Sequence, residues 1–287
     1  MILLDALAEA KARLAAAGVP TPEVDARLLA AHVCGVAPLA LDRRQEAPVE
    51  FFELVKRREA REPLQHIVGT APFGPHDLRV GPGVFIPRPE TEVLADWAAA
   101  HAEKLVRSSA AEGAPVVVDL CTGSGALACY IAARVPQVEV WGVEKQVSAL
   151  GFAVRNAPEA RIVQGDVTDI DCLAELNGQV DIVVTNPPYV PETPDLEPEV
   201  YCDPPEAVFA GADGLEVIRA MAPTVERLLK PGGVVGFEHD DNASELVAPI
   251  LRAQGLGNVR PMADLTGTER FTIASKVSQA RTKGTSA

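Results

Sequence analysis

The sequence has no excess of basic side chains. Among its 287 residues, 26 Lys and Arg face 40 Asp and Glu, which gives a net charge of −14. A protein that covers a nucleic-acid backbone needs a basic surface, so this balance argues against a broad nucleic-acid interface. The shortage is uneven, since residues 1–75 carry 9 basic and 10 acidic side chains and residues 76–275 carry 14 and 30. We therefore expect no direct nucleic-acid partner.

Long apolar runs and paired cysteines are also missing. No apolar stretch approaches the ~20 residues that span a bilayer, which argues against a membrane partner. The N-terminus lacks the basic segment of a secretory signal, and the five cysteines form no C-x-x-C pair, a pattern typical of reduced thiols. These absences predict a cytoplasmic protein, and we expect no metal site.

The first part of the chain predicts a small helical bundle. Leu and Ala dominate residues 2–17 up to Gly18, which is typical of a helix with a glycine stop. A second helix is predicted over about 22–35, because a Thr-Pro-Glu start signal opens it, and a third over about 48–61. Three short helices without a catalytic motif predict a separate domain over residues 1–75.

Glycine and proline recur through residues 63–89, which predicts a connector that includes a hairpin. We expect extended segments around 65–68 and 78–80. Arg88 stands between two prolines, so its backbone is held extended and its side chain could point at a ligand. The alternative is a surface arginine with no fixed partner.

Beyond the connector, strand and helix patterns alternate, and this order predicts an α/β domain over residues 76–275 with a mostly parallel sheet covered on both faces. The expected strands cover residues 116–120, 139–143, 161–164, 180–185, 234–238, 258–260 and 271–274. The expected helices cover residues 91–106, 124–134, 146–156, 171–176, 214–229 and 243–254. The loop 190–210 is long enough to be a lid or a binding loop. Residues 276–287 predict a disordered tail.

Asn186-Pro187-Pro188-Tyr189 follows the apolar run 181–185, which is short and β-branched and predicts a buried parallel strand. Ligands collect at the carboxyl ends of such strands. The Asn186 side-chain oxygen and the Pro187 carbonyl could together accept both hydrogens of an –NH2 group, and Tyr189 offers a flat face for stacking. We interpret the tetrapeptide as a grip on a planar nitrogen; a rigid turn with a capping Asn is the alternative.

A glycine-rich turn follows the first strand of the second domain. Gly123 and Gly125 allow a tight turn close to a ligand, and Glu144, 19 residues after Gly125, could accept both hydroxyls of a ribose. The site is therefore expected to hold a nucleoside. The spacing Gly123-x-Gly125-x-x-Ala128 also satisfies the loose dinucleotide fingerprint, so an NAD-dependent oxidoreductase is a fair rival on this loop alone.

Two acids favour a different nucleoside. Asp119, just before the glycine turn, suits a cation such as the amino group of a methionine moiety, and Asp166 after the third strand could accept from an adenine amino group. An acidic pocket suits S-adenosylmethionine, which carries a sulfonium and an ammonium group. The alternative for Asp119 is a capping role in the loop.

Several segments together resemble a known family. They are Asp119-Leu120-Cys121-Thr122-Gly123-Ser124-Gly125, Glu144, Gly165-Asp166, Asn186-Pro187-Pro188-Tyr189 and, upstream, Phe85-Ile86-Pro87-Arg88-Pro89-Glu90-Thr91-Glu92. With its helical N-terminal domain, the chain resembles the HemK/PrmC release-factor glutamine methyltransferases over about residues 1–275. The resemblance implies a class I, Rossmann-like methyltransferase sheet with a small N-terminal helical bundle domain.

The resemblance also implies the reaction, which is N5-methylation of the Gln in the Gly-Gly-Gln loop of peptide chain release factors with S-adenosylmethionine as donor. It assigns the acceptor and its chemistry to Asn186, Pro187 and Tyr189, and we add Phe85, Arg88 and Pro188 as expected substrate contacts. Cofactor binding is expected from Asp119, Cys121, Thr122, Gly123, Ser124, Gly125, Glu144, Asp166, Val167 and Asn186. We expect the domain of residues 1–75 to dock the protein substrate.

The sequence departs from the family pattern at three cofactor positions. Cys121 stands where Gly is usual, Glu144 replaces the more usual Asp, and Val167 occupies a position where an aromatic residue is common. These departures bear on cofactor affinity more than on the type of reaction.

Other classes of protein are kept as rivals. An N6-adenine nucleic-acid methyltransferase uses the same kind of tetrapeptide on a flipped base, but the acidic charge of residues 76–275 disfavours it. A binding protein that has lost catalysis is another rival. His239 could be proposed as a general base, although a lone His at a strand end is more often structural.

Overall fold

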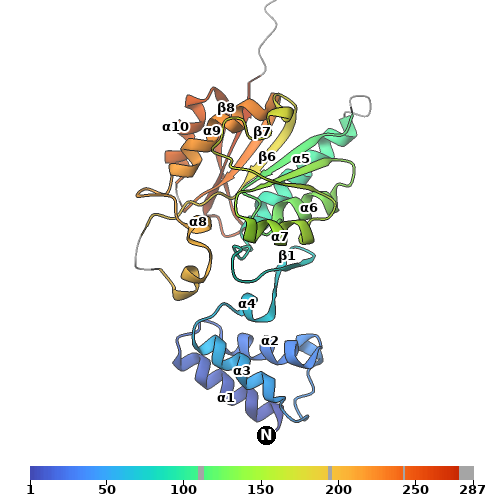
Figure 1. Ribbon diagram of the computed structural model, residues 1–287, viewed down its shortest axis with the longest axis vertical. Coiled ribbons are helices and arrows are strands. Elements are labelled where there is room, and N and C mark those ends of the chain that lie inside the picture. Colours follow the sequence, from blue (N-terminus) through green and yellow to red (C-terminus); the bar gives the residue numbers. More distant parts are fainter. Residues whose placement is uncertain (109–112, 193–195, 242, 278–287) are drawn as a thin grey trace, which may run out of the picture.

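The computed structural model describes residues 1–108, 113–192, 196–241 and 243–277, and it consists of a helical bundle and a larger α/β domain joined by a short connector (Figure 1). From residue 278 onward the predicted disordered tail lies outside the described part, and Lys276 itself ends the last strand. None of the described helices is long and apolar enough to cross a bilayer.

The N-terminal bundle contains four α-helices and one 3₁₀ turn. They are α1 (Leu3–Ala16), α2 (Pro22–Cys34), η1 (Pro38–Ala40), α3 (Val49–Glu59) and α4 (Leu64–Val68). The bounds of α1, α2 and α3 confirm the predicted helices to within two residues. Their apolar faces meet in a core of their own, where Leu14, Leu29 and Phe51 are fully buried. The bundle therefore has the separate core expected of a domain.

The connector differs from the prediction at its start. Residues 65–68, expected to be extended, lie in α4, because Pro63 suits the position before a first helical turn and Gly69, with a φ of 78°, ends that turn in the left-handed region. The expected hairpin follows, with β1 (Thr70–Phe73) antiparallel to β2 (His76–Arg79).

The α/β domain is built on a seven-stranded sheet with the order β5-β4-β3-β6-β7-β9-β8. Its strands are β3 (Val116–Leu120), β4 (Glu139–Glu144), β5 (Arg161–Gln164), β6 (Val180–Thr185), β7 (Leu229–Glu238), β8 (Leu256–Ala263) and β9 (Glu269–Lys276). Neighbours from β5 to β7 are parallel, whereas β9 is antiparallel to β7 and β8. Each predicted strand is confirmed. β7 begins earlier than predicted because Leu229 pairs with Val180 beside an irregularity in the register.

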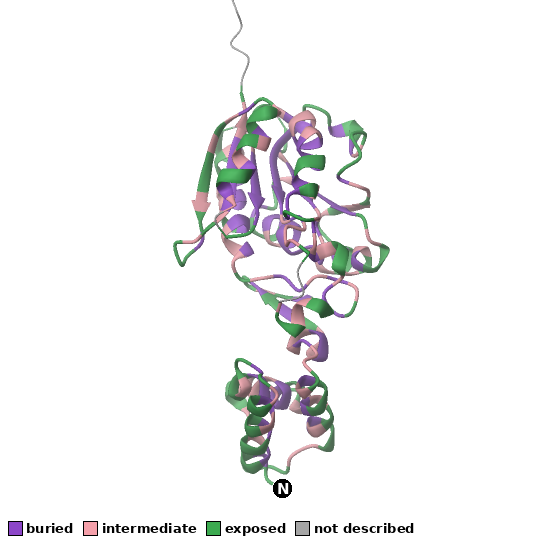
Figure 2. Cartoon of the chain, turned by 90° about the vertical axis from the view of Figure 1, so that its left-hand side faces the viewer, coloured by how far each residue is buried: buried purple, intermediate pink, exposed green. Residues whose placement is uncertain are grey.

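Helices cover both faces of this sheet, and the buried residues gather between the two layers (Figure 2). The covering helices are α5 (Thr91–Ser108), α6 (Ala126–Arg134), α7 (Val147–Asn156), α9 (Glu216–Leu228) and α10 (Ser244–Ala253). One face packs against α9 and α10 through Ile218 and Leu251, and the other packs against α5 and α6 through Leu94 and Ile131. The expected helix 171–176 is only a 3₁₀ turn, η2 (Ala174–Leu176), because Leu173 before it has a positive φ of 54°.

The long loop after β6 has structure of its own. The Val190 N–H donates to the Val208 carbonyl and the Ala210 N–H donates to the Val190 carbonyl, both at 3.0 Å, so the two ends of the loop are closed on each other. Between them lie η3 (Pro198–Cys202) and α8 (Pro205–Val208), while residues 193–195 lie outside the described part.

Ion pairs tie this loop to the bundle. Arg58 of α3 contacts Asp25 at 2.8 Å and Glu199 at 2.7 Å, and Arg61 contacts Glu199 at 2.5 Å and Glu197 at 3.0 Å. Burial alone would raise the pKa of Glu199, but the two guanidinium groups lower it to about 2. The loop and the bundle are therefore held together by charges that stay ionised at neutral pH.

Gly125 needs to be glycine because its φ is 81° and a Cβ would lie 3.1 Å from the Cα of Ala153 in α7. Gly178, in the same domain, has a φ of 66° and open space around it. Left-handed backbone costs a residue with a Cβ roughly 1–2 kcal/mol. Gly178→Ala should lower the free energy of unfolding by about that amount, and Gly125→Ala by more, because backbone atoms of α7 cannot move aside. Urea titration measures both losses, and equal losses would show that the turn does not rest on α7.

Candidate active site

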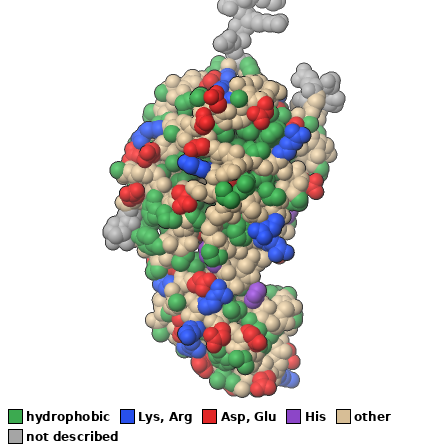
Figure 3. Space-filling model, viewed as in Figure 1, with side chains coloured by type: hydrophobic (Ala, Val, Ile, Leu, Met, Phe, Trp, Pro, Cys, Tyr) green, Lys and Arg blue, Asp and Glu red, His purple; other side chains and the backbone are tan. Residues whose placement is uncertain are grey.

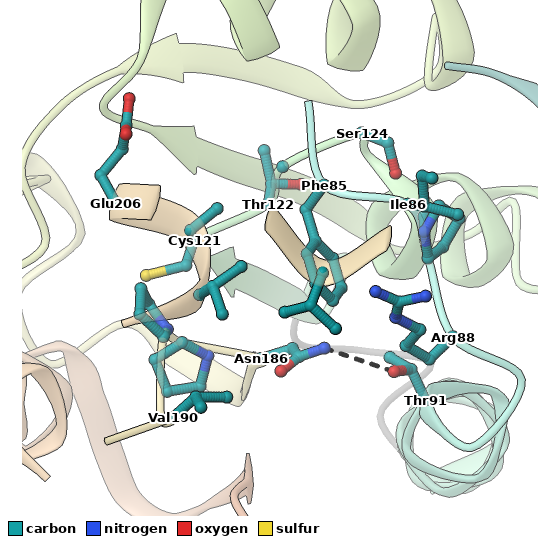
Figure 4. Close-up of a pocket in the computed structure, with 18 of the residues that line it drawn as sticks. Phe85, Ile86, Arg88, Thr91, Cys121, Thr122, Ser124, Asn186, Val190 and Glu206 are labelled. Atoms are coloured by element: carbon teal, nitrogen blue, oxygen red, sulfur yellow. Dashed lines mark hydrogen bonds between the residues drawn. The ribbon is translucent and has the colours of Figure 1, made fainter. Parts of the chain in front are cut away.

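A cavity of about 660 Å³ lies at the carboxyl ends of β3, β4 and β6. The glycine turn, the connector residues 85–91 and the tetrapeptide line it (Figure 4). Residues of the loop after β6 and of the N-terminal bundle complete the lining. It is lined by Pro20, Thr21, Asp25, Arg58, Phe85, Arg88, Thr91, Cys121, Thr122, Gly123, Ser124, Glu144, Asp166, Val167, Asn186, Pro187, Pro188, Tyr189, Glu199 and Glu206, among others. The structure thus brings together all but two of the site residues expected from the sequence, the exceptions being Asp119 and Gly125.

The glycine turn is compact and strained. The Gly125 N–H donates to the Thr122 carbonyl at 2.7 Å, and Gly125 then opens α6. Gly123 has a φ of 55°, which suits glycine, but Cys121 has a φ of 63° with a Cβ present. The chain therefore stores backbone strain at Cys121, where the resembled family usually has Gly.

Asp119 is not among the residues that line the cavity, so its expected contact with a cofactor stays a prediction. Its carboxylate is fully buried, accepts from the Thr122 hydroxyl at 2.5 Å and from the Ala128 N–H at 3.2 Å, and its other oxygen has no partner among the described residues. Burial raises the pKa of Asp119 to about 7. The side chain supports the turn and the start of α6 from behind, so the capping alternative describes its contacts better.

Glu144 ends β4 and reaches the glycine turn. One carboxylate oxygen accepts from the Gly123 N–H at 2.8 Å and the other from the Gln146 N–H at 2.7 Å. Burial raises the pKa of this carboxyl group, although these backbone donors lower it. A carboxylate oxygen has two lone pairs, so each oxygen can accept one more hydrogen from a ligand hydroxyl in the cavity.

Asp166 and Val167 line the same end of the cavity. Lys145 contacts Asp166 at 2.8 Å, and the Thr168 hydroxyl and N–H donate to it, so the pKa of Asp166 falls to about 2. Val167 is buried with 7% exposure and offers an aliphatic wall where a ring would stack. This end of the cavity therefore presents one ionised acid beside an apolar surface.

Asn186 stands at the end of β6 with its amide held on one side. Its Nδ2 donates to the Thr91 hydroxyl at 3.3 Å, and its Oδ1 is turned away from Thr91 (Figure 4). Pro187 is buried, and Pro188 and Tyr189 are partly exposed in the cavity wall. Because the two prolines lack N–H groups, the tetrapeptide offers acceptors and few donors to anything bound beside it.

Arg88 lines the cavity, but its guanidinium group already forms an ion pair within the protein. It contacts Asp203 at 2.8 Å and lies over the Phe85 ring, with its Cζ 4.9 Å from the ring centroid. Asp203 also accepts from the Ile86 N–H at 3.2 Å, and burial raises the pKa of Asp203 to about 6. Arg88 therefore binds the loop after β6 to the connector, a partner that the sequence pattern did not predict.

His239 is structural, as the alternative interpretation held. It is fully buried, its Nε2 lies 2.9 Å from the Thr272 hydroxyl and its Nδ1 2.9 Å from the Asp240 carbonyl. Burial lowers its pKa. It is not among the residues that line the cavity, and no histidine is among the described residues that do.

Thr91, Glu199 and Glu206 line the cavity but were not expected as site residues. Thr91 lies in the proline-rich segment 85–92, so its position in that motif could have indicated a site residue. Glu199 and Glu206 lie in the loop after β6, whose folding over the cavity no local pattern reveals. Together with Glu144 and Asp166 they give the cavity an acidic lining that suits a cationic ligand. Within the described ranges, no His, Cys, Asp and Glu cluster could hold a metal ion.

Comparison with known proteins gives independent evidence about the family of this chain. Residues 5–69 match the family described as PrmC N-terminal domain, and residues 101–200 match the methyltransferase small domain. The chain is 51% identical over 284 residues to a release factor glutamine methyltransferase of Corynebacterium glutamicum, covering 96% of this chain and 100% of that protein. It is 47% identical over 261 residues to a 4-amino-L-phenylalanine/4-methylamino-L-phenylalanine methyltransferase of Streptomyces pristinaespiralis, covering 88% of each.

A solved structure shows the same fold at low identity. The hMettl16 catalytic domain, in complex with the MAT2A 3′UTR hairpin 6, superposes with a TM-score of 0.53 and 14% identity, covering 71% of this chain and 76% of that one.

The contacts of Glu144 lead to a prediction about cofactor affinity. Glu144→Ala removes the acceptor of two backbone donors and the two oxygens expected to bind a ribose. S-adenosylmethionine should therefore bind about 10–100 times more weakly, the equivalent of roughly 1.5–3 kcal/mol. Glu144→Asp keeps both oxygens and should recover most of this loss. Calorimetric titration gives the affinities.

Glu206→Ala is the matched control, because it removes an exposed acid from the same cavity without touching the glycine turn. Glu206→Ala should lose less affinity for S-adenosylmethionine than Glu144→Ala does. Unchanged affinity in Glu144→Ala would remove Glu144 from the cofactor site.

Proposed function

The chain belongs to the release factor glutamine methyltransferase family, and from this premise we propose that it methylates the side-chain amide nitrogen of the Gln in the Gly-Gly-Gln loop of peptide chain release factors. The observation that carries the proposal is the Asn186 amide. Its Nδ2 donates to Thr91, its Oδ1 accepts no hydrogen bond from any described residue, and Pro187 lines the same cavity. A primary amide presents two hydrogens to two such acceptors.

The residues present fit S-adenosylmethionine as the donor, which supplies a sulfonium-bound methyl group. Gly123 gives a backbone surface without a Cβ, and Glu144 has lone pairs to spare for ribose hydroxyls. Asp166 and the apolar side chain of Val167 suit an adenine edge and face. The acidic lining complements the positive charge of the donor, and Asp119 supports the turn that all of these contacts depend on.

The acceptor nitrogen is a poor nucleophile, since its lone pair is delocalised into the carbonyl. In this proposal Asn186 and Pro187 accept its two hydrogens, which fixes its orientation and favours the positive charge that builds on nitrogen during attack. Tyr189 and Phe85 pack beside the planar amide. No general base is assigned, because the proton can leave to water after transfer.

Two alternative acceptors define the comparison arms of the test. The Streptomyces pristinaespiralis relative is named for an amino group on an aromatic ring, which is also a planar –NH2, so free 4-amino-L-phenylalanine is one arm. Duplex DNA is the other, for the adenine-methylating rival. Basic and acidic side chains are interspersed on the face seen in Figure 3.

Asn186→Ala deletes one of the two acceptors and should lower kcat about 10–100-fold rather than only raise KM, because the contact strengthens as charge builds on nitrogen. Asn186→Asp keeps an acceptor but adds a charge, and its kcat should also fall. Transfer of tritiated methyl groups to whole release factor measures both. An undiminished kcat in Asn186→Ala would mean that the amide is held elsewhere.

The matched substrate is a release factor with Glu in place of the loop Gln. It has no –NH2 and would set a carboxylate against carbonyl oxygens, so no methyl transfer should be detected. Comparable turnover of the Glu form, or faster transfer to 4-amino-L-phenylalanine or DNA than to the Gln form, would contradict the proposed function.

We further propose that the bundle of residues 1–75 docks the protein substrate. It has its own core, and its residues Pro20, Thr21, Asp25 and Arg58 line the same cavity as the tetrapeptide. A release factor whose loop enters this cavity would meet the bundle first.

Deletion of residues 1–75 should leave S-adenosylmethionine binding nearly intact and reduce methylation of whole release factor at least about tenfold, because docking contributes binding energy to the protein substrate. Full-length Arg61→Ala is the control, since it loosens the loop after β6 but keeps the bundle. Equal losses in the two variants would mean that the bundle acts only by holding the loop.

A further inference from the structure

A chain of buried polar groups lies behind Asn186. Thr91, at the start of α5, has 3% exposure and accepts from the Asn186 Nδ2, and Glu238, at the end of β7, has 2% exposure. The Tyr189 hydroxyl donates to the Glu238 Oε1 at 3.5 Å. Burial raises the pKa of this carboxyl group, and the nearby Thr91 side chain lowers it. The two buried residues, one from α5 and one from β7, thus contact two side chains of the tetrapeptide, Asn186 and Tyr189.

Glu238 is a destabilising residue at this buried position. Its Oε2 has no hydrogen-bond partner among the described residues, and no lysine or arginine forms a described ion pair with it. The charged groups that face it are Glu90, which disfavours its ionisation, and Arg270, which favours it. A buried carboxylate with an unpaired oxygen destabilises a fold, so its presence needs a reason beyond packing.

The reason lies in the direction of hydrogen bonds. An ionised carboxylate only accepts, so it draws the single hydroxyl hydrogen of Thr91 toward itself. The lone pairs of that hydroxyl are then left for the Asn186 Nδ2, and Oδ1 must face the cavity. Without this constraint the amide could turn by 180° and present its –NH2 to the –NH2 of the acceptor, which is a donor facing a donor.

We propose that Thr91 and Glu238 are positioning residues that hold the Asn186 amide with its oxygen toward the acceptor nitrogen, an assignment that rests on the proposed function. Neither residue touches the acceptor in this scheme. Both act through Asn186, and Tyr189 is tied to the same carboxylate, so the two side chains that flank the acceptor are oriented by one buried group.

Protonation of Glu238 should undo this arrangement. A protonated carboxyl group donates to Thr91, which frees the Thr91 hydrogen to point at Asn186 and favours the turned amide. Burial raises the pKa of Glu238 to about 7. The ionised form is present above that pH, so kcat should rise as the pH increases from about 6 to 8 and level off.

Thr91→Val removes the hydroxyl while keeping the shape of the side chain. We expect kcat with whole release factor to fall about tenfold, which is the effect of one lost hydrogen bond. The affinity for S-adenosylmethionine should stay within about twofold. Thr91→Ser restores the hydroxyl and should recover most of the activity. Thr224→Val is the matched control, because it deletes another fully buried hydroxyl in α9 and should leave kcat within about twofold.

Glu238→Gln tests whether ionisation of the Glu238 carboxyl group controls the pH dependence of kcat. A neutral amide at this position can both donate and accept, so it does not direct the Thr91 hydrogen, and kcat should be lowered and flat between pH 6 and 8. Asp119, with a pKa of about 7, Asp203, with a pKa of about 6, and Glu144, whose pKa burial also raises, are other carboxyl groups near the site that could give a pH dependence. A Glu238→Gln enzyme that keeps the wild-type pH profile would assign that profile to them and overturn the proposal.

A measurement independent of turnover uses the Asn186 side-chain –NH2 resonances in ¹⁵N-labelled protein. They should shift between pH 6 and 8 in the wild type and not in Glu238→Gln. If the wild type transfers no methyl group to release factor, the proposed function fails while this titration can still succeed. If transfer is robust but Thr91→Val equals wild type in kcat, only the positioning role fails.

Discussion

The parallel pairing of β3 with β6 is the contact on which the site depends. Leu120 pairs with Thr185, and the Thr185 hydroxyl donates to the Leu120 carbonyl at 2.7 Å although the two residues are 65 positions apart. At β3 the strand order reverses, with β4 on one side and β6 on the other, so a crevice opens at the carboxyl ends. The glycine turn and Asn186 leave the sheet side by side there, and neither could form the cavity alone.

Buried acids gather around this crevice. Burial raises the pKa of Asp119, Glu144, Asp203 and Glu238, and among these only Asp203 has a described ion-pair partner. The pKa of Asp264 is lowered instead, because a hydroxyl, backbone N–H groups and Arg270 surround its carboxylate. Desolvated carboxyl groups at one end of a sheet are typical of functional sites, where stability is given up for a fixed electrostatic field.

The sequence predicted the regular parts of the fold because they follow from local pattern. The strands 116–120, 161–164 and 180–185 agree with the structure at both ends, since apolar β-branched runs bounded by turn residues define them. The tetrapeptide and the glycine turn were likewise recognisable as motifs. The directions of Asp119 and Arg88 were not, because their partners are decided by packing, and Asp203 lies 115 residues beyond Arg88. The turns α4 and η2 were missed because single helical turns depend on one or two cap residues.

The loop after β6 links the tetrapeptide of the active site to the N-terminal bundle. Its first residues continue the tetrapeptide, its ends are closed through Val190, and its middle carries Glu199, which pairs with Arg58 and Arg61 of the bundle. Because Arg58 is also paired with the buried Asp25, moving Glu199 away would leave a guanidinium with 6% side-chain exposure short of one partner. Separating partly buried charges costs more than separating exposed ones. Any motion that widens the cavity at this loop therefore has to carry the bundle with it or expose these charges to water.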